Sequence, residues 1–274
     1  MEYIFYNAQN NFNLQYPLLL APLRTDDNLD TIDRKIRLVA EFLDIFVARR
    51  MVNFRTLGYS AIVYTMFNLM KDLRDLPIPD LAALLKAKVA DMEETFAGVS
   101  AFYLHQMNRH NVHHLLARIT YHIEHESHVE SSFETYVSRE IKKPFEVEHI
   151  WASNYEPYIT EFPTEEEFSR YRNRFGGLIL LPRGFNQSLG ADCYEDKVKA
   201  YFGQNLLAKS LNQLCYRNNP SFKAYLERSG LPFEPYSIQF NRSALDARQE
   251  LYRRICEEIW SPARFERELV EGPR

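Results

Sequence analysis

Three residues between positions 145 and 201 have side chains suited to hydrolytic chemistry. Glu148 and His149 end a strand-like segment, and Asn186 lies in a glycine-containing loop after a second apolar segment. A histidine with a pKa near neutrality can take a proton from water. Carboxylate and amide oxygens are the ligands that a hard cation such as Mg²⁺ prefers. Hydrolysis of a phosphodiester uses both a base and a cation.

Each of these residues also has an ordinary interpretation. An isolated Glu-His pair at a strand end is most often solvated, and a loop asparagine most often belongs to a turn. Successive strand residues point to opposite faces, so Glu148 and His149 share a site only if the strand ends or bends there. The spacing of the whole set favours a site over these alternatives.

The surrounding elements are predicted to run strand, long loop, strand, loop and helix. Residues 145–150 alternate apolar and polar side chains, and Leu178–Leu181 is a short apolar run. Thr164 begins a short helix between them through a capping box. A further helix is expected to begin near Asp192 or Tyr194. Three more are expected at 206–212, 221–229 and 244–260.

The first 140 residues are predicted to form a helical bundle. Hydrophobic spacing predicts helices at 31–52, 61–74, 80–95 and 111–126, with Asp30, Ser60 and Asp80 as the first three caps. The first 25 residues, interrupted by Pro17 and Pro22, are expected to be irregular. The predicted fold class is mainly α, with a bundle over residues 1–143 and a second domain over residues 144–274.

The second domain resembles the ββα-metal fold of HNH endonucleases. That pattern has an acidic residue and a histidine on the first strand, and an asparagine or histidine nine residues after a middle asparagine. Here Asn186 stands nine residues after Gly177. The resemblance implies that His149 is the general base and that Glu148 and Asn186 bind a divalent metal, Mg²⁺ or Mn²⁺. A ββα-metal motif would thus be embedded in the helical fold.

A narrower resemblance spans nearly all of the chain. The segments Tyr16–Leu20, 145–151, 171–174, 204–211 and 245–252 are similar to the C-terminal half of GmrSD-type, modification-dependent restriction endonucleases. Relatives of that kind include phosphorothioate-sensing, SspE-like proteins. The resemblance implies the DNA-cutting half of a system that restricts phage or other foreign DNA. It also implies a partner, an N-terminal domain or subunit that hydrolyses nucleotides and senses the modification.

Two features depart from these patterns. The chain has no phosphate-binding GxxxxGK[ST] loop, so we expect a fragment or one partner of a split system and assign it no NTPase activity. Gly177 replaces the middle asparagine, which normally orients the base or braces the loop, although a neighbour such as Asn173 could substitute. The alternative function is therefore a catalytically weak DNA-binding or assembly module.

Basic residues gather around the same segment. Arg170–Lys209 contains seven basic and three acidic residues, a balance of +4, whereas the whole chain carries −4. Arg174 and Arg183 flank the second strand, and Lys197 and Lys199 lie on the helix that follows. We predict that these four side chains contact DNA phosphates, with a solvated surface as the alternative.

Seven histidines lie between residues 105 and 128. His110 and His114 have a spacing that can hold a metal on a helix, but neither an HExxH motif nor a nearby cysteine accompanies them. Leucine and isoleucine make the apolar face of this helix, so most of the histidines are expected on its solvated face. A histidine-rich metal-binding protein is the third and weakest hypothesis.

The overall composition narrows the class of protein. A net charge of −4 argues against a protein that coats nucleic acid through bulk charge. Cys193, Cys215 and Cys256 form no CxxC pair, so a reducing cytoplasm is the expected location. No apolar run approaches the length of a membrane span, and no signal-peptide pattern is present.

Overall fold

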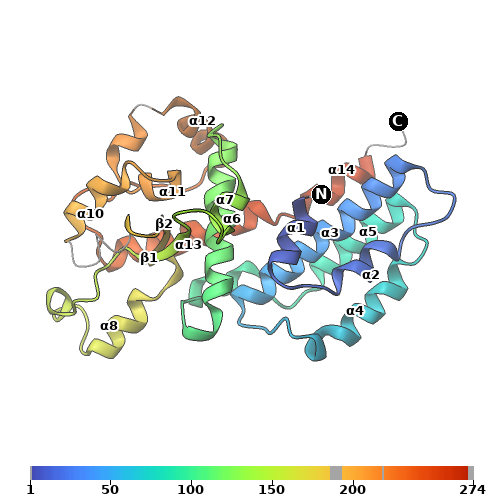
Figure 1. The fold of residues 1–274 in the computed structure, drawn as a ribbon, viewed down its shortest axis with the longest axis horizontal. Coiled ribbons are helices and arrows are strands. Elements are labelled where there is room, and N and C mark those ends of the chain that lie inside the picture. The colour runs from blue at the N-terminus through green and yellow to red at the C-terminus, as the bar shows by residue number, and fades with distance from the viewer. Residues whose placement is uncertain (1, 186–192, 218, 271–274) are drawn as a thin grey trace. The chain divides into compact units, whose positions relative to one another are not determined.

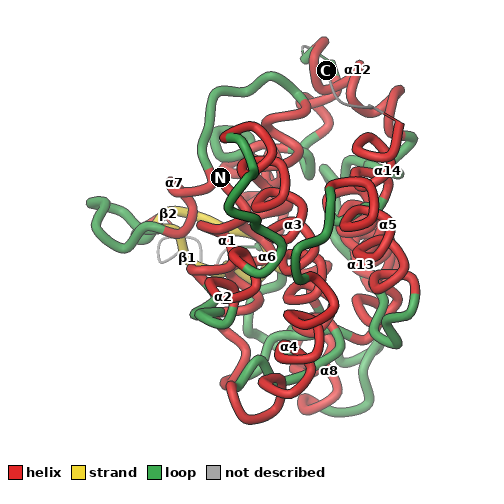
Figure 2. Tube along the Cα trace, turned by 90° about the vertical axis from the view of Figure 1, so that its right-hand side faces the viewer, coloured by secondary structure: helices red, strands yellow, loops and turns green. Residues whose placement is uncertain are grey.

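The computed structural model describes residues 2–185, 193–217 and 219–270. These residues form a mainly helical structure with a two-stranded sheet, which confirms the predicted class (Figures 1 and 2). The chain divides into two compact units: unit 1 is Met1–Gly98 with Trp260–Arg274, and unit 2 is Val99–Ile259. The expected boundary at 143/144 falls inside unit 2, because the helix before it packs on the sheet after it.

Unit 1 is a bundle of helices drawn from both ends of the chain. Its members are α1 (Glu2–Gln9), α2 (Gln15–Leu20), α3 (Leu29–Val52), α4 (Tyr59–Leu73), α5 (Ile78–Ala90) and α14 (Ala263–Val270). Helix α3 packs against α1, α2 and α5, and α14 packs against α5. The expectation of an irregular start is wrong. Pro17 is the third residue of α2, where a backbone N–H has no partner within the helix in any case.

The three predicted caps lie inside the first turns of their helices. Asn28, and not Asp30, caps α3, because its side chain accepts a hydrogen bond from the Thr31 backbone N–H at 2.8 Å. Gly58 and Pro77 precede α4 and α5. A carboxylate in the first helical turn interacts favourably with the helix dipole, so such a residue is found as readily just inside a helix as at its cap.

Unit 2 contains the predicted strand pair and most of the remaining predicted helices. Its elements are α6 (Arg109–Glu126), α7 (Phe133–Val137), β1 (Phe145–His149), α8 (Glu165–Arg172), β2 (Leu178–Pro182), α10 (Tyr194–Tyr201), α11 (Leu206–Lys209), α12 (Pro220–Ser229) and α13 (Arg242–Ile259). Thr164 caps α8 as expected, since its hydroxyl accepts from the Glu167 N–H at 3.2 Å.

The two strands pair antiparallel and set the end of β1 against the start of β2. His149 lies opposite Leu178, and Phe145 lies opposite Pro182. Leu178–Leu181 is completely buried, and α6 packs against both strands. Helix α8 lies in the long connection between the strands. A short strand pair is not stable by itself, so α6, together with α11 against β2, supplies the burial that holds it.

Helix α13 packs directly on the backbone that leads into β2. A Cβ atom on Gly176 would lie 2.3 Å from the Gln249 backbone nitrogen, so only glycine fits there. The Gln249 Oε1 accepts from the Gly176 N–H at 2.5 Å, and its Nε2 donates to the Phe102 carbonyl at 3.0 Å. The Tyr252 hydroxyl donates to the Leu178 carbonyl at 2.8 Å. These bonds fix the start of β2.

Cys193, Cys215 and Cys256 are all free thiols. Cys215 and Cys256 are buried, and Cys193 is exposed. In the part of the chain that the structure describes, no helix combines the length and the apolar character that crossing a membrane requires.

Candidate active site

The end of β1 brings a buried carboxylate next to the predicted base. Strand β1 ends at His149, as a shared site for Glu148 and His149 requires. The Glu148 side chain is buried, and its Oε1 accepts from the Lys197 Nζ at 2.7 Å. Lys197 also donates to the His149 carbonyl at 3.2 Å. Lys197, from α10, therefore joins the two residues at the strand end.

This placement corrects the interpretation of Lys197. The sequence predicts contact with a DNA phosphate, with a solvated surface as the alternative, but the Lys197 side chain is only 2% exposed. An ammonium group that is buried against a carboxylate cannot reach a phosphate without breaking the pair. Lys197 therefore balances the charge of Glu148.

Asn173 orients the imidazole of His149. The His149 Nε2 lies 2.7 Å from the Asn173 Oδ1. An amide oxygen only accepts hydrogen bonds, so in this arrangement Nε2 carries the proton and Nδ1 keeps the lone pair of the neutral ring. Asn173 follows the last residue of α8, and its carbonyl accepts from the Leu104 N–H at 2.7 Å. The imidazole is thus held from a second element, 24 positions along the chain.

Gly177, which replaces the middle asparagine of the HNH pattern, lies in a tight place. A Cβ atom there would lie 3.1 Å from the Leu245 Cδ1 and 3.3 Å from the Arg172 carbonyl. Both distances are slightly shorter than ordinary van der Waals contacts, so a larger residue requires the Leu245 side chain and the Arg172 carbonyl to move by a few tenths of an ångström. The side chain that contacts the base comes instead from Asn173, four positions earlier.

An aromatic cluster fixes α8 beside the end of β1. Trp151 is 2% exposed and stacks on Phe168 of α8, with 5.8 Å between the ring centroids. Its indole N–H donates to the Phe240 carbonyl at 2.5 Å. Tyr158 stacks on the same Phe168 ring at 4.8 Å. Because the cluster joins the residue two places after His149 to α8, it holds the position from which Asn173 reaches the imidazole.

The site keeps its histidine neutral and surrounds it with positive charge. Burial, together with the charges of Arg172, Lys197 and Arg109, lowers the pKa of His149 to about 4 against the raising effect of the Asn173 hydrogen bond. Burial raises the pKa of Glu148, while Lys197 and Arg172 lower it. The result is a neutral imidazole beside a carboxylate whose charge is balanced by Lys197.

A second buried histidine holds the other end of β1. The His113 Nε2 on α6 lies 3.1 Å from the Phe145 carbonyl, to which it donates. Burial lowers the pKa of His113 to about 4. His114 is also buried. The expectation of a solvated face is therefore wrong for these two histidines, while His110, His125 and His128 are exposed.

Acid is expected to destabilise the protein through these histidines before its carboxylates titrate. The pKa values of His113 and His149 are about 4 in the folded chain against roughly 6.5 in an unfolded one. The unfolded chain therefore binds protons first, so stability is retained above about pH 6.5 and falls as the pH drops toward 4. Thermal unfolding from pH 7.5 to 4.5 would measure this. His113→Gln is expected to flatten the profile, and an equally steep profile in that variant would contradict the assignment.

The other predicted DNA contacts are paired with carboxylates. The Arg174 guanidinium donates to Asp246 at 2.5 Å and lies over the Tyr171 ring. Arg183 pairs with Glu146 at 2.7 Å on the surface. Lys199 is exposed and pairs with Asp196 at 3.2 Å and Glu195 at 3.6 Å. Their contact with DNA stays a prediction, because a surface pair opens at little cost.

The metal-binding prediction concerns residues that are only partly described. Asn186 lies outside the described residues. Among those that the structure describes, no group of three or more His, Cys, Asp or Glu side chains is arranged to hold a metal. The His110 and His114 rings lie 6.4 Å apart without a third ligand of that kind. Glu148 is the one predicted ligand that can be placed.

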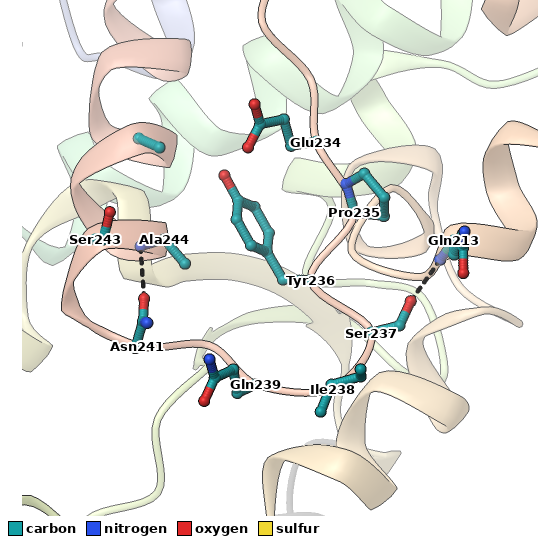
Figure 3. A pocket seen from close by; sticks show the side chains of 11 residues that line it. Gln213, Glu234, Pro235, Tyr236, Ser237, Ile238, Gln239, Asn241, Ser243 and Ala244 are labelled. Atoms are coloured by element: carbon teal, nitrogen blue, oxygen red, sulfur yellow. Dashed lines mark hydrogen bonds between the residues drawn. The ribbon is translucent and has the colours of Figure 1, made fainter.

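A separate pocket of about 530 Å³ lies at the start of α13. The chain segment 234–239 forms one side, and Asn241, Ser243 and Ala244 form another (Figure 3). The Ser237 hydroxyl accepts from the Gln213 N–H at 2.7 Å, and the Asn241 Oδ1 accepts from the Ala244 N–H at 3.0 Å. None of the described residues that line it is a predicted site residue.

Comparison with known proteins gives one family. Residues 90–255 match the model of the C-terminal domain of GmrSD restriction endonucleases. The match includes β1, α8, β2 and most of α13. No curated protein matches the chain. No solved structure matches it.

Proposed function

The chain belongs to the family of GmrSD restriction endonuclease C-terminal domains, and on that premise we propose that it cuts DNA by metal-dependent, HNH-type hydrolysis at His149. The protein is then the effector of a restriction system directed against phage or other foreign DNA. Another domain or subunit would hydrolyse nucleotides and sense the modification. We place this activity in the cytoplasm.

The observation that carries the proposal is the hydrogen bond between His149 and Asn173. With Nε2 bound to the Asn173 Oδ1 at 2.7 Å, Nδ1 is the nitrogen that can accept a proton from water. A base held in one tautomer and one orientation avoids the cost of reorganising during the reaction. The proton of the attacking water would pass to Nδ1 as the oxygen bonds to phosphorus.

The low pKa of His149 also suits a substrate that is an anion. A base with a pKa of about 4 is neutral at pH 7 but weak. A phosphodiester bound beside it would add negative charge, which favours the protonated imidazole and raises its pKa. The base would therefore become stronger when the substrate binds.

The described donors are compatible with a divalent cation but do not form a complete site. Mg²⁺ commonly takes one or two protein carboxylates and completes its shell with water and substrate oxygens. Glu148 and Asn186 would hold the cation, which would neutralise charge on the phosphate and hold the leaving oxygen. Because one Glu148 oxygen bonds to Lys197 at 2.7 Å, the cation would share this carboxylate with Lys197.

The same ion pair favours a second candidate function, a DNA-binding or assembly module that does not cut. A carboxylate already neutralised by an ammonium is a poorer ligand than a free one. In that case the protein would bind DNA and leave it intact at high enzyme and Mn²⁺ concentrations.

A plasmid assay separates the two functions. Supercoiled plasmid is incubated with the protein in Mg²⁺, Mn²⁺ or EDTA, with and without the nucleotide-hydrolysing partner of the family. Metal-dependent nicking or linearisation that Asn186→Ala abolishes would support the nuclease. Intact plasmid in every condition, together with measurable DNA binding, would leave the binding module.

Asn173 is expected to control how well His149 works as a base. Asn173→Ala removes the hydrogen bond that orients the ring, and we expect the cleavage rate to fall about 10²-fold, the scale of a misplaced catalytic group. Asn173→Asp keeps an acceptor at Nε2 and adds a negative charge, so it should retain activity. Cleavage rates under single-turnover conditions measure both. A rate in Asn173→Ala equal to the wild type would remove Asn173 from the mechanism.

A further inference from the structure

One arginine outside the predicted site residues, Arg172, lies next to the Asn173 that holds the base. Arg172 ends α8 and precedes the Asn173 that holds His149. Its Nε donates to the carbonyls of Trp151 at 2.9 Å and Ala152 at 3.1 Å, in the segment that follows β1. Neither of its terminal nitrogens bonds to a described residue. The guanidinium is thus anchored through Nε, with its two outer nitrogens left for another acceptor.

A second arginine, at the start of α6, also acts on His149. Arg109 begins α6 one turn before His113, whose Nε2 lies 3.1 Å from the Phe145 carbonyl of β1. Residues four apart lie on one face of a helix, so Arg109 is on the face that packs on β1. It is exposed and forms no ion pair with a described residue. Its charge is one of three that lower the pKa of His149.

The charges that surround His149 do not balance. Lys197 offsets Glu148 at 2.7 Å, and Arg174 and Arg183 have carboxylate partners of their own. Arg172 and Arg109 remain. Neither forms an ion pair with a described residue, although Glu148 and Arg172 act on each other electrostatically. Lys197, Arg172 and Arg109 thus act on His149 together, and the Glu148 carboxylate offsets only one of these three charges. The remaining excess of positive charge attracts an anion, and the planar group of arginine fits phosphate oxygens in pairs.

We propose that Arg172 and Arg109 form the phosphate-binding site for the DNA backbone, with Arg172 holding the phosphate that faces His149 and Arg109 holding a neighbouring one. The inference rests on the proposed function and names the group of the substrate that this site recognises. These contacts are independent of base sequence, because they reach only the backbone. They replace Lys197 as the cations nearest to the reacting phosphate.

The roles of Arg172 and Arg109 are tested by measuring DNA binding in a variant that does not cut. The parent protein carries His149→Ala, and its Kd for a labelled duplex is measured in EDTA over a range of NaCl concentrations. Arg172→Gln and Arg109→Gln should each weaken binding about tenfold, as for the loss of a charge-assisted hydrogen bond. Each should also reduce the slope of log K against log salt by about 0.9. Arg170→Gln, an exposed arginine on the same α8, should change neither quantity.

Arg172→Lys keeps the charge but loses the paired geometry, so it should keep the slope and lose part of the affinity. This variant and Arg109→Gln, which changes an exposed side chain, remain informative if Arg172→Gln lowers the melting temperature. If Arg172→Gln and Arg109→Gln both give the Kd and the slope of Arg170→Gln, the phosphate site is wrong. If only one of the two variants weakens binding, the two arginines do not act as a pair. If the His149→Ala parent protein shows no detectable DNA binding, the phosphate site is wrong as well.

These experiments distinguish a failure of the phosphate site from a failure of the proposed nuclease activity. Normal binding by the arginine variants, with metal-dependent cleavage that needs His149, would reject this phosphate site and keep the nuclease. Weakened binding by both arginine variants, with cleavage that is unaffected by His149→Ala, would keep the phosphate site and reject the proposed base.

Discussion

Replacing His149 with alanine is expected to lower the rate of metal-dependent DNA cleavage by about 10³-fold, within the range that general base catalysis contributes. The imidazole is the described group that is neutral and oriented by Asn173 at 2.7 Å, and it follows directly in the chain the Glu148 that pairs with Lys197. Without it, water must lose its proton to solvent. The measurement is single-turnover cleavage of supercoiled plasmid at saturating metal.

The control for this variant is a histidine outside the site. His125 is exposed on α6, and His125→Ala should cut at the wild-type rate. Far-ultraviolet circular dichroism and the melting temperature establish that His149→Ala remains folded. Cleavage by His149→Ala at the wild-type rate would mean that the base lies elsewhere or that another nuclease contaminates the preparation.

Replacing Lys197 with methionine is expected to lower the free energy of unfolding by about 3–5 kcal/mol, the usual cost of removing one partner from a buried ion pair. The Lys197 and Glu148 side chains are 2% and 7% exposed, and their Nζ and Oε1 atoms lie 2.7 Å apart. Methionine fills the space but leaves the carboxylate buried without its cation. Urea denaturation at pH 7 measures the change.

The neighbouring Lys199 is a matched control for that substitution. It lies two positions along α10 and its side chain is 64% exposed, so Lys199→Met should change stability by roughly 0.5 kcal/mol or less. Adding Glu148→Gln to Lys197→Met removes the buried charge and should recover much of the loss. Equal effects of Lys197→Met and Lys199→Met would contradict the burial of the pair.

The pH dependence of the Lys197→Met variant has a defined sign. Lys197 lowers the pKa of Glu148 against the raising effect of burial, so its loss leaves that pKa raised. A carboxyl group with a raised folded pKa binds protons more tightly when folded, so folding is favoured as the pH falls. The deficit relative to the wild type should therefore shrink between pH 7 and about 4.5.

The sequence predicted the elements whose side chains repeat regularly. The helix expected at 111–126 is α6, and the two strands expected near 145–150 and 178–181 are β1 and β2. Because each of these elements is buried on one face or on both, its apolar residues recur at a regular spacing that is visible in the local sequence. The family resemblance, carried by segments such as 145–151 and 171–174, is confirmed by the match over 90–255.

The contacts that make the site could not be predicted in the same way. The segment around Lys197 has charged neighbours on both sides, and nothing in it shows that one ammonium turns inward to a glutamate 49 positions earlier. The role of Asn173 was foreseen only as one option for replacing Gly177. Arg172 was one of several basic residues in its stretch, and its anchoring depends on where Trp151 and Ala152 lie after folding. Such pairings follow from tertiary packing and not from local pattern.

Unit 1 is built from the two ends of the chain, so during translation it can be completed only after unit 2. Trp260 donates to the Asp44 Oδ2 at 2.8 Å, and Phe265 is fully buried. A ribosome makes Trp260 and Phe265 only after the whole of unit 2. The apolar surface of α5 that receives α14 therefore stays uncovered while the unit with His149 is already complete. In a nascent chain, unit 1 is the part that a chaperone would need to protect until its last helix is made.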